Sequence, residues 1–558
     1  MRYVSSCCCA LALAVLLSAC GKSNPAGTSS PTTYSVGGSV AGLTGTLVLQ
    51  NNGGDSLSIS SNGTFAFSTT LAPNATYDVT ILTQPANQTC SVSNPTGTLT
   101  SSISSVLVSC VSTSTVTNQW MWRSGADDVG AAGVYGTQGS AAATNTPGSR
   151  REPISWTDAS GNLWLFGGYG TGAGTASVGM LDDLWEFSPT GASALQWVWQ
   201  GGSQSAGAAA AYGTLGTPAA GNDPGARAGS ASWADAAGNL WLFGGSGLAG
   251  QSSEQFNDLW EYQASSAEWV WVGGSSSANG AGSYGALGVA AAGNLPPART
   301  NAVSWVDGSG VFWLFGGAQF NADGSLAAVF NDLWSYDPTS GLWTWVSGSN
   351  TPDAAAVYGT QGIAAAGNVP GARLGASAWV DPHGNFWLFG GEGQSGGVSQ
   401  QYSDLWEYSP GNGDWTWVGG VSAPDTGGVY GTMGSAAAGD APGARVSALT
   451  WEDAAGNFWL FGGYGYDQGG VINALNDLWQ YDPSTGLWTW VGGSSSGGAA
   501  GNYGTQGTSA ATNVPGARQQ AAAWRDASGN FWLFGGYGID AFGAQGNLND
   551  LWVYTPNP

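Results

Sequence analysis

Positive charge is scarce in this sequence. The 558 residues include 11 Lys and Arg against 35 Asp and Glu, which gives a formal net charge of −24. Lys22 is the only lysine, and the chain contains no run of basic residues. A protein that binds nucleic acid needs clustered basic side chains to replace the counterions of the phosphates. The composition therefore argues against nucleic acid as a partner, and an anionic membrane surface would repel the chain.

Histidine is rare in this sequence, and cysteine occurs only in its N-terminal part. His383 is the only histidine, and no cysteine follows Cys110. A Ser-His-Asp triad would have to use His383. The sequence contains neither a phosphate-binding loop nor a zinc motif. The segment Asn321-Ala322-Asp323-Gly324 matches part of a calcium loop but lacks the remaining ligands. We therefore expect no metal site and no cofactor.

The first residues have the pattern of a targeting signal. Arg2 precedes an apolar stretch from Cys7 to Leu17, which is too short to span a membrane as a mature helix. The following Leu17-Ser18-Ala19-Cys20 resembles a bacterial lipobox, in which Cys20 is acylated and becomes the new N-terminus. An ordinary secretory signal cut at a small residue is the alternative. The resemblance implies a signal peptide over 1–19 and a membrane anchor through the lipid on Cys20.

The residue after Cys20 bears on location. It is Gly21 rather than Asp, which by resemblance to Gram-negative lipoproteins favours the outer membrane. We expect a protein of the cell envelope that faces either the periplasm or the surface. Cys7, Cys8 and Cys9 leave with the signal, so Cys90 and Cys110 remain as an even pair in an oxidising compartment, and we expect a disulfide between them.

A small domain precedes the longest part of the chain. Residues 20–33 are rich in Gly, Ser, Pro and Thr and are typical of a flexible tether, and 112–118 is a second linker. Between them, 34–111 contains strand-like runs at 46–49, 64–67, 77–80 and 106–108. Asn52-Gly53 and Asn62-Gly63 are hairpin signals. We expect a β-sandwich with the Cys90–Cys110 disulfide.

One long motif occurs six times in residues 119–558. It runs Trp-x-Trp, Tyr-Gly-Thr-x-Gly, Pro-Gly-Ala-Arg, Ser-Trp-x-Asp-x-x-Gly-Asn-x-Trp-Leu-Phe-Gly-Gly and Asn-Asp-Leu-Trp-x-Tyr, with small variations. The Phe-Gly-Gly copies begin at Phe166, Phe243, Phe315, Phe389, Phe461 and Phe534. Repeats spaced by about 74 residues are supersecondary units that bury their apolar faces by stacking on their neighbours.

Each repeat has the pattern of four strands. The Asn-x-Trp-Leu-Phe run is almost continuously apolar, which predicts a strand covered on both faces. The segment after the Arg is made of small residues, as in 228–232, and suits the innermost strand near a central axis. The Asp-x-x-Gly-Asn pieces predict hairpin turns. The Gly pair after Phe permits positive φ and close approach of another backbone.

These residues resemble the Kelch repeat, which forms propeller blades of four antiparallel strands. The double Gly after an apolar strand, the Asn-Asp-Leu-Trp-x-Tyr strand, the later Trp and the Arg of the first strand carry the resemblance. It implies an all-β fold with a six-bladed propeller. Trp120-Met121-Trp122 precedes the first copy and no such strand follows the last one, so we expect this strand to complete the sixth blade. The repeats exceed the usual length of about 50 residues by the segment with Tyr-Gly-Thr-x-Gly and Pro-Gly-Ala-Arg.

Spacing separates the constant from the variable parts of the repeat. The first Trp of Trp-x-Trp precedes the Phe of Phe-Gly-Gly by 46 positions in every copy, as from 120 to 166, whereas the following loop varies in length and sequence. Variable loops on a constant frame are where recognition usually lies, although loop drift gives the same pattern. The candidate ligand-binding residues are Arg151, Glu152, Tyr169, Thr300, Asn301, Phe320, Glu392, Tyr466, Asp467, Gln519, Asp540 and Phe542.

The repeated arginines allow two interpretations. They are Arg150, Arg227, Arg299, Arg373, Arg445 and Arg518. As a ring at the mouth of the channel, they could clamp an anion or a carboxylate, and in eukaryotic Kelch domains, the resemblance implies, Arg at this position can line the ligand pocket. Alternatively, each pairs with a repeat Asp or with backbone carbonyls of the added segment, and full repetition favours this packing role.

The sequence favours binding over catalysis. A copper-radical oxidase resembling galactose oxidase needs two His ligands and a Tyr–Cys cross-link, which the repeats cannot supply. A sugar-processing enzyme resembling sialic acid mutarotase remains open, with Arg151, Glu152, Glu392 and Arg525 as available groups. We expect a lipid-anchored, monomeric envelope protein whose propeller binds an envelope protein or a glycan. A structural surface protein without a small ligand is the other alternative.

Overall fold

The computed structural model describes residues 32–43, 45–85, 88–112, 117–174, 178–190, 195–249 and 252–557. These residues form 40 strands and no helix, so the all-β class predicted from the sequence is confirmed. It follows that none of them lies in a helix able to cross a membrane. The expected signal peptide and Cys20 lie outside the described residues. The chain divides into two compact units, 1–115 and 116–558, which are described separately.

The first unit consists of two four-stranded sheets. One has the order β4-β1-β8-β6 and the other β3-β2-β5-β7, and β1 and β8 are parallel neighbours. The strands are β1 (Val36–Ala41), β2 (Leu47–Asn51), β3 (Asp55–Ile59), β4 (Gly63–Ala66), β5 (Thr76–Thr83), β6 (Gln88–Ser93), β7 (Thr96–Thr98) and β8 (Ile103–Ser112). Alternate side chains of β2, including Leu47 and Leu49, are buried between the sheets, as the period of a strand requires.

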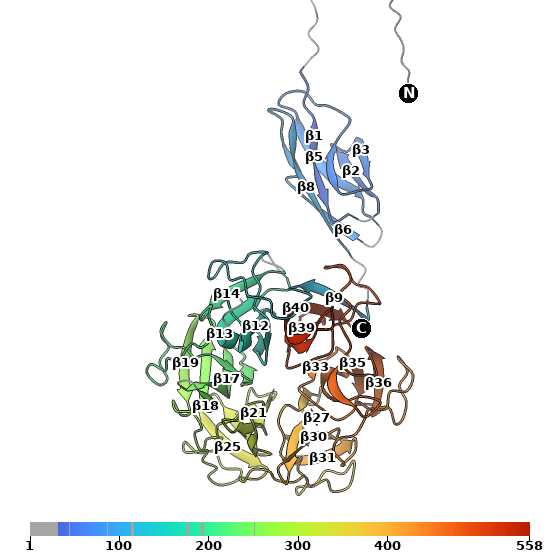
Figure 1. The fold of residues 1–558 in the computed structure, drawn as a ribbon. Helices are drawn as coiled ribbons and strands as arrows, with labels where there is room; N and C mark the ends of the chain where they lie inside the picture. The colour runs from blue at the N-terminus through green and yellow to red at the C-terminus, as the bar shows by residue number, and fades with distance from the viewer. Residues whose placement is uncertain are drawn as a thin grey trace, which may run out of the picture. The chain divides into compact units, whose positions relative to one another are not determined.

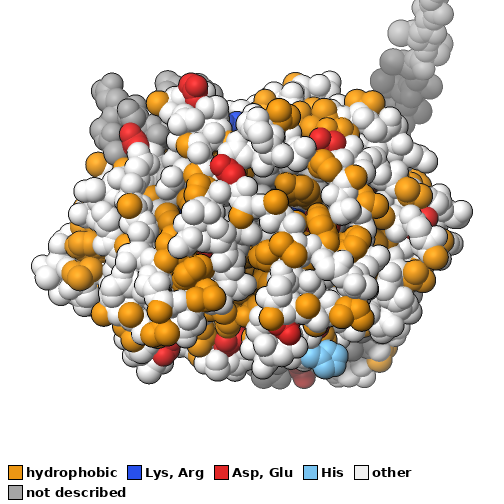
Figure 2. Space-filling model, turned by 90° about the horizontal axis from the view of Figure 1, so that it is seen from below, with side chains coloured by type: hydrophobic (Ala, Val, Ile, Leu, Met, Phe, Trp, Pro, Cys, Tyr) orange, Lys and Arg blue, Asp and Glu red, His pale blue; other side chains and the backbone are white. Residues whose placement is uncertain are grey.

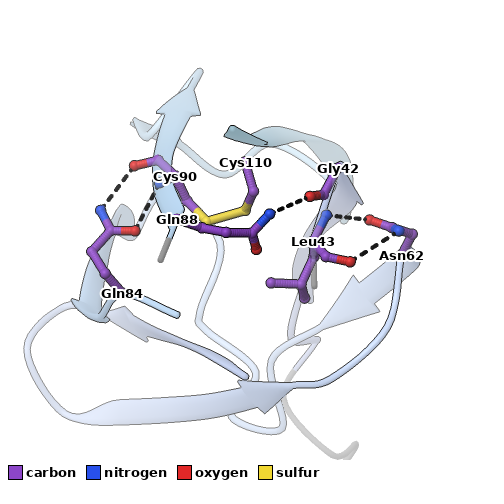
Figure 3. Close-up of a disulfide and its surroundings, with 7 residues drawn as sticks. All are labelled: Gly42, Leu43, Asn62, Gln84, Gln88, Cys90 and Cys110. Carbon is purple, nitrogen blue, oxygen red and sulfur yellow. Dashed lines mark hydrogen bonds between the residues drawn. A yellow bond between two sulfur atoms is a disulfide. The ribbon is translucent and has the colours of Figure 1, made fainter. Parts of the chain in front are cut away.

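The disulfide joins two neighbouring strands of the first sheet. Cys90 on β6 and Cys110 on β8 lie opposite each other and are bonded, as the cysteine count predicted. Figure 3 shows the polar contacts around the bond. The Gln84 side chain binds both backbone groups of Cys90, and Gln88 Nε2 donates to the Gly42 carbonyl at 2.8 Å.

One of the two hairpin signals was wrong. Asn52-Gly53 does join the paired strands β2 and β3. Asn62-Gly63 instead connects β3 to β4, which lie in different sheets. The Asn62 side chain accepts from the Leu43 N–H at 2.7 Å and donates to its carbonyl at 3.2 Å (Figure 3). The same residue pair thus serves a crossover here, because Asn62 is bound to a distant backbone segment rather than to its own turn.

The second unit contains six sheets of the pattern expected for propeller blades. We number them blade 1 to blade 6 in the chain order of the repeated Arg. In each, the inner strand pairs with a second, which pairs with a third, which pairs with an outer strand, all antiparallel. Two short hairpins, β22–β23 and β28–β29, extend blades 3 and 4.

The strands have the following bounds. Blade 1 contains β10 (Arg150–Arg151), β11 (Ile154–Thr157), β12 (Leu163–Thr171), β13 (Val178–Phe187) and β14 (Trp197–Gly201). Blade 2 contains β15 (Arg227–Ala228), β16 (Ala231–Ala234), β17 (Leu240–Ala249), β18 (Ser252–Gln263) and β19 (Glu268–Gly273). Blade 3 contains β20 (Val303–Val306), β21 (Phe312–Phe315), β22 (Ala318–Phe320), β23 (Leu326–Val329), β24 (Leu333–Asp337) and β25 (Leu342–Ser347). Blade 4 contains β26 (Ser377–Val380), β27 (Phe386–Phe389), β28 (Glu392–Ser395), β29 (Val398–Gln401), β30 (Leu405–Ser409) and β31 (Asp414–Gly419). Blade 5 contains β32 (Arg445–Val446), β33 (Leu449–Glu452), β34 (Phe458–Tyr466), β35 (Ile472–Asp482) and β36 (Leu487–Gly492). Blade 6 contains β37 (Arg518–Gln519), β38 (Ala522–Arg525), β39 (Phe531–Ile539), β40 (Gln545–Thr555) and β9 (Gln119–Ser124).

The N-terminal strand of the unit closes the ring. β9 pairs with β40 through the register Trp552↔Trp122 and Tyr554↔Trp120, so blade 6 contains both ends of the unit, as the sequence predicted. The inner strands β11, β16, β20, β26, β33 and β38 contact one another in turn, and β38 contacts β11. Figure 1 shows the blades arranged around a centre, with β9 beside β40.

Aromatic side chains fill the space between adjacent blades. Between blades 2 and 3, for example, the Trp233 ring stacks on Phe312 at 5.3 Å, and Trp241 meets the same ring edge-on. Equivalent stacked pairs recur between blades 3 and 4, 4 and 5, and 5 and 6. Each aromatic residue buries a large apolar area, so these contacts are the main attraction between blades.

The added segment of each repeat covers the edge of a blade. We call the residues between an outer strand and the next repeated Arg an insert, and number inserts 1 to 6 by the blade that follows: 125–149, 202–226, 274–298, 348–372, 420–444 and 493–517. In insert 1, Gly139 N–H donates to the Trp199 carbonyl and Asn145 Nδ2 to the Trp197 carbonyl, both on the outer strand β14. The inserts thus occupy hydrogen-bonding groups that an open strand edge would present to other chains.

The inserts also place apolar side chains on the surface. Leu215, Leu287, Val357, Ile363 and Met433 are exposed there. Figure 2 shows one side of the molecule, where hydrophobic side chains lie in many separate groups among uncharged ones and few charged groups occur. Scattered apolar residues of this kind are normal for a protein surface and do not by themselves mark a binding site.

Candidate functional site

The six repeated arginines are buried and paired. Arg150 Nη1 donates to Asp183 Oδ1 at 2.6 Å and its Nη2 to Oδ2 at 2.7 Å, with both side chains fully buried. The same two-point pairing recurs in every blade, with Nη1–Oδ1 distances between 2.6 and 2.9 Å. The other pairs are Arg227–Asp258, Arg299–Asp332, Arg373–Asp404, Arg445–Asp477 and Arg518–Asp550.

Each of these aspartates also binds a tyrosine and a tryptophan. Asp183 Oδ2 accepts the hydroxyl of Tyr135 from insert 1 and the indole N–H of Trp185, both at 2.7 Å. The Arg guanidinium also donates to the first Gly of Phe-Gly-Gly, as Arg150 Nη1 does to the Gly167 carbonyl at 2.9 Å. The charged pair therefore joins an insert, an inner strand and the second and third strands of its blade.

The electrostatics of this site keep the guanidinium charged. Burial lowers the pKa of Arg150, but the charge and hydrogen bonds of Asp183, with further contributions from Tyr135, together raise the net pKa above its ordinary value. Burial, followed by the charge of Asp183, raises the pKa of the Tyr135 phenol, which stays protonated. Of the two interpretations, pairing with a repeat Asp is the one found. An anion clamp at the channel mouth is ruled out for these six residues, because none of the guanidinium groups is exposed.

A closed ring of backbone hydrogen bonds lies near the buried arginines. In each blade, the residue two positions after the Arg donates its N–H to the carbonyl of its counterpart in the preceding blade, and blade 1 binds blade 6. The six bonds are Gly229 to Glu152, Asn301 to Gly229, Gly375 to Asn301, Ser447 to Gly375, Gln520 to Ser447 and Glu152 to Gln520, at 2.7 to 3.2 Å. We call these six residues the axial ring.

The axial ring requires an unusual backbone. All six residues have positive φ, and four of them are not glycine: Glu152 (52°), Asn301 (54°), Ser447 (56°) and Gln520 (60°). Such conformations are strained for residues with a side chain and cluster at functional sites. A cavity of about 180 Å³ is lined by the ring residues and those that follow them.

Glu152 is the charged member of the axial ring. Its Oε1 accepts from Asn301 Nδ2 at 3.2 Å and from Gln520 Nε2, so three of the ring side chains are tied together. Burial raises the pKa of Glu152, against the hydrogen bond from Asn301 and the charge of Arg151, which lower it. Glu152 and Asn301 were both predicted as site residues, and the structure places them in contact. Gln520 lies beside them and occupies the same position, two residues after the repeated Arg.

Arg151 lies at the same end of the blades and stacks on two tyrosines. Its guanidinium carbon is 4.7 Å from the ring centre of Tyr169 and 5.3 Å from that of Tyr537, both partly exposed. Among the described residues, Arg151 makes no ion pair, in contrast to the six buried arginines. We call Arg151, Glu152, Tyr169 and Tyr537, with the axial ring, the mouth site. Tyr537 and its counterpart Tyr464 were not among the predicted site residues. The sequence does distinguish them, because Phe-Gly-Gly-Tyr-Gly occurs in copies 1, 5 and 6 only.

Several predicted loop residues serve the loops themselves. Asp467 Oδ1 accepts from the N–H groups of Gly469 and Val471, and Asp540 Oδ1 from those of Phe542 and Ala544. Both aspartates are buried, so the structure gives them a turn-forming role instead of a ligand contact.

Thr300 is buried too, and its hydroxyl donates to the Gly229 carbonyl. Glu392 is partly exposed and accepts from Ser399 Oγ at 2.5 Å. Gln519 pairs with Tyr537 across β37 and β39.

Three predicted aromatic residues lie in the variable loops or strand ends on the mouth side. Phe542 is 76% exposed, the highest value among the large hydrophobic side chains of the described residues. Tyr466 and Phe320 are partly exposed, and Phe320 packs against a small apolar cluster that includes Leu374. The structure does not bring these three residues into one pocket with Glu152.

The other end of the channel is distinct from the mouth. A cavity of about 410 Å³ there is lined by the inner strands and includes Glu452, whose Oε1 accepts the Val380 N–H at 2.6 Å. Burial raises the pKa of Glu452, while the nearby Arg525 lowers it. Arg525 is thus remote from Arg151, Glu152 and Glu392, so the four groups considered for sugar processing do not share one site.

The described residues hold no cluster of three or more metal-ligating side chains. His383 lies in the turn before β27 with its side chain 85% exposed, and its Nδ1 is 4.0 Å from Asp381 Oδ1. Neither observation supports a catalytic histidine.

Comparison with known proteins finds one family model that matches part of the chain. Residues 214–418, which run from insert 2 to the end of blade 4, match the model of the KLHDC2/KLHL20/DRC7 Kelch-repeats domain. A search of the curated proteins finds no match. The family match and the all-β blades together support a Kelch-repeat protein, in agreement with the motif pattern.

Proposed function

We propose that this Kelch-repeat chain is a lipid-anchored protein of the bacterial cell envelope that binds a partner protein at the mouth site and the loops around it. Kelch repeats commonly serve as protein-binding scaffolds. The observation that carries the proposal is Arg151, held between Tyr169 and Tyr537 without an ion pair in the described residues. Arginine and tyrosine are the residue types that most often dominate the binding energy of interfaces.

The exposed aromatic side chain of Phe542 supports the same surface. It extends from the loop between β39 and β40, at the end of the blades where β10 and Arg151 lie. The frame beneath these loops is rigid, because every blade is joined to the next by aromatic packing and by the axial ring. A rigid frame reduces the ordering cost of binding.

A glycan is the second candidate partner. The tyrosines of Phe-Gly-Gly-Tyr-Gly, Tyr169, Tyr464 and Tyr537, come from consecutive blades and are partly exposed. Their rings offer apolar faces with polar tips, which suits stacking on a sugar.

Binding is tested with purified protein that carries Arg151→Ala and Tyr537→Ala together. We expect the affinity for a captured envelope protein to fall at least tenfold in a titration, whereas His383→Ala, at the opposite end of the strands, leaves it unchanged. A glycan array probed with the natural chain and these two variants tests the second candidate, a glycan. Binding that survives the double substitution in both assays contradicts the mouth site.

The anchor is tested separately, because it rests on the sequence alone. We expect metabolic labelling with a fatty acid to modify the full chain and to be lost in Cys20→Ser, with the protein released from the membrane fraction. Labelling that persists in Cys20→Ser would reject the lipid anchor and leave the binding proposal untouched.

A further inference from the structure

The residue before each buried Asp of the third strand joins its blade to the next insert. In four blades it is an asparagine whose Nδ2 donates to a proline carbonyl of that insert, at 3.1 to 3.3 Å. The pairs are Asn257–Pro296, Asn331–Pro370, Asn476–Pro515 and Asn549–Pro147. In blade 4, Ser403 stands at this position and bonds to the Thr426 hydroxyl.

Blade 1 has a carboxyl group at this joint. Asp182 replaces the asparagine and is 3% exposed. Its Oδ2 accepts the Ser203 N–H at 3.1 Å, but its buried Oδ1 has no hydrogen-bond partner. The Pro224 carbonyl, which an amide would bind, accepts a hydrogen bond from Arg227 Nη2 instead. An ionised carboxylate cannot donate, so this joint lacks the bond that four sister joints contain.

We propose that Asp182 is a proton-operated latch between blade 1 and insert 2. With a proton, its carboxyl group can donate to the Pro224 carbonyl as the sister amides do to theirs. Without the proton, neither carboxylate oxygen can donate to the Pro224 carbonyl, and the insert is held less tightly. A protonated carboxyl group has nearly the shape of the amide that it replaces and, like the amide, can donate a hydrogen bond.

The surroundings set the range in which the latch works. The charged groups that act on Asp182 are Asp223 of insert 2 and Asp183 of its own strand, while Arg227 and Arg150 bind other partners close by. Burial and then the charge of Asp223 raise the pKa of Asp182 from 3.8 to about 7. When insert 2 opens, the carboxyl group returns towards its ordinary pKa.

The direction of the pH effect follows from these two values. Between pH 3.8 and about 7 the closed joint binds a proton that the open joint releases. Opening therefore becomes easier as the pH rises through this window, by up to tenfold per unit, and changes no further above it. The joint is tight in acid and loose at mildly alkaline pH.

Loosening insert 2 would uncover one blade edge. The Gly216 N–H of this insert donates to the Trp271 carbonyl and Asn222 Nδ2 to the Trp269 carbonyl, both on the outer strand β19 of blade 2. When insert 2 leaves, β19 presents these groups to another chain. The latch would thus make the edge of blade 2 accessible in a pH-dependent way.

The test is hydrogen exchange of the full chain at pH 5 and pH 8, with rates corrected for the intrinsic effect of pH. We expect the protection of insert 2 to fall at least tenfold from pH 5 to pH 8, while insert 4, joined through Asn331, stays within twofold. In Asp182→Asn, which keeps the shape and supplies an N–H donor, the difference should vanish and insert 2 should stay protected at pH 8.

A transplant separates the latch from a general effect of pH. Asn331→Asp should give insert 4 a similar loss of protection as the pH rises, with insert 2 unchanged. The proposal is overturned if insert 2 shows the same protection at both pH values, or if Asp182→Asn retains the pH dependence of the natural chain. Restoration of protection at pH 8 by Ca²⁺ would also overturn it, since the buried oxygen would then belong to a cation site.

Discussion

At the scale of single residues, the buried ion pairs are the most costly part of the fold. Removing both charges from water costs several kcal/mol per ion, and only good geometry with further hydrogen bonds compensates for it. Here Asp404 accepts two bonds from Arg373, one from Tyr358 and one from Trp406. These aspartates therefore act as junctions that hold an insert and three strands of the same blade in register.

The first prediction concerns the charge of this junction. Asp404→Asn keeps the shape but leaves Arg373 buried without a counter-charge, so we expect the free energy of unfolding to fall by about 3–5 kcal/mol. Tyr358→Phe removes a single hydrogen bond from the same carboxylate and should cost about 1 kcal/mol. Denaturant unfolding of both variants measures the difference, and equal losses would show that the charge is not what makes the junction sensitive.

The second prediction concerns an aspartate that breaks a repeated pattern. In five inserts an asparagine donates its Nδ2 both to a carbonyl of its own insert and to the first Trp of an outer strand, as Asn368 does to Ile363 and Trp415. Asp440 takes this place in insert 5, and its buried Oδ2 has no partner. We expect Asp440→Asn to raise the free energy of unfolding by about 1–3 kcal/mol, because it restores both donors. The reverse change, Asn368→Asp, should lower it, and a neutral result for both would contradict this account.

The site could be predicted from the sequence only in part. The variable positions after the repeated Arg did lead to Arg151 and Glu152, which lie in the mouth site. Full repetition of the six Arg favoured pairing over a free ring, but the partner could not be chosen, because the repeat contains more than one Asp. Asp467 and Asp540 looked like loop ligands because sequence does not show that a carboxylate is occupied by the N–H groups of its own turn.

At the scale of strands and turns, the Gly pair after Phe fixes the contact between blades. The first Gly has positive φ, and a Cβ there would meet the backbone of the next repeated Arg. For Gly316, φ is 67° and the added atom would lie 2.5 Å from the Arg373 carbonyl oxygen. The sequence predicted the need for positive φ and close approach, but not that the approaching backbone belongs to the next blade.

The third prediction tests this close approach. Gly316→Ala must shift the Arg373 backbone as well as adopt a strained φ, so we expect a loss of about 3 kcal/mol or more in the free energy of unfolding. Gly362 is the matched control, since it has a φ of 77° and open space around its added Cβ. Gly362→Ala should cost about 1 kcal/mol, which is the strain alone. Thermal or denaturant unfolding of the two variants measures both losses in the free energy of unfolding. Equal losses would contradict the close-approach argument.

The inserts explain why these repeats exceed the usual Kelch length. Their constant length was visible in the sequence, as was their motif, but their role was not. The hydrogen bonds from Gly139, Asn145 and their counterparts show that inserts cover the outer strands. Side chains that donate to a strand from outside a sheet leave no periodic pattern, so strand prediction alone could not have assigned this role.

At the scale of the whole molecule, the closure of the ring decides how the blades share stability. The sequence predicted the closure, because the strand missing from the last repeat is present before the first one. The pairing of β9 with β40 and the hydrogen bond between Glu152 and Gln520 both join the first repeat to the last. A closed ring leaves no blade with a bare face, so we expect the six blades to unfold together.

The last prediction tests closure by moving β9. A chain of residues 126–557 lacks this strand and with it the buried Trp120, so we expect its melting temperature to fall by about 10 °C or more relative to 117–557. A second chain carries residues 119–124 after Thr555, joined by the turn sequence Asp482-Pro483-Ser484-Thr485-Gly486, which links the third and fourth strands of blade 5. In this order β9 becomes an ordinary fourth strand of blade 6 and should restore most of the loss. Appending a Gly-Ser segment of equal length is the control and should restore nothing. If the relocated strand fails to raise the melting temperature above that control, the pairing of β9 with β40 does not supply the stability assigned to it.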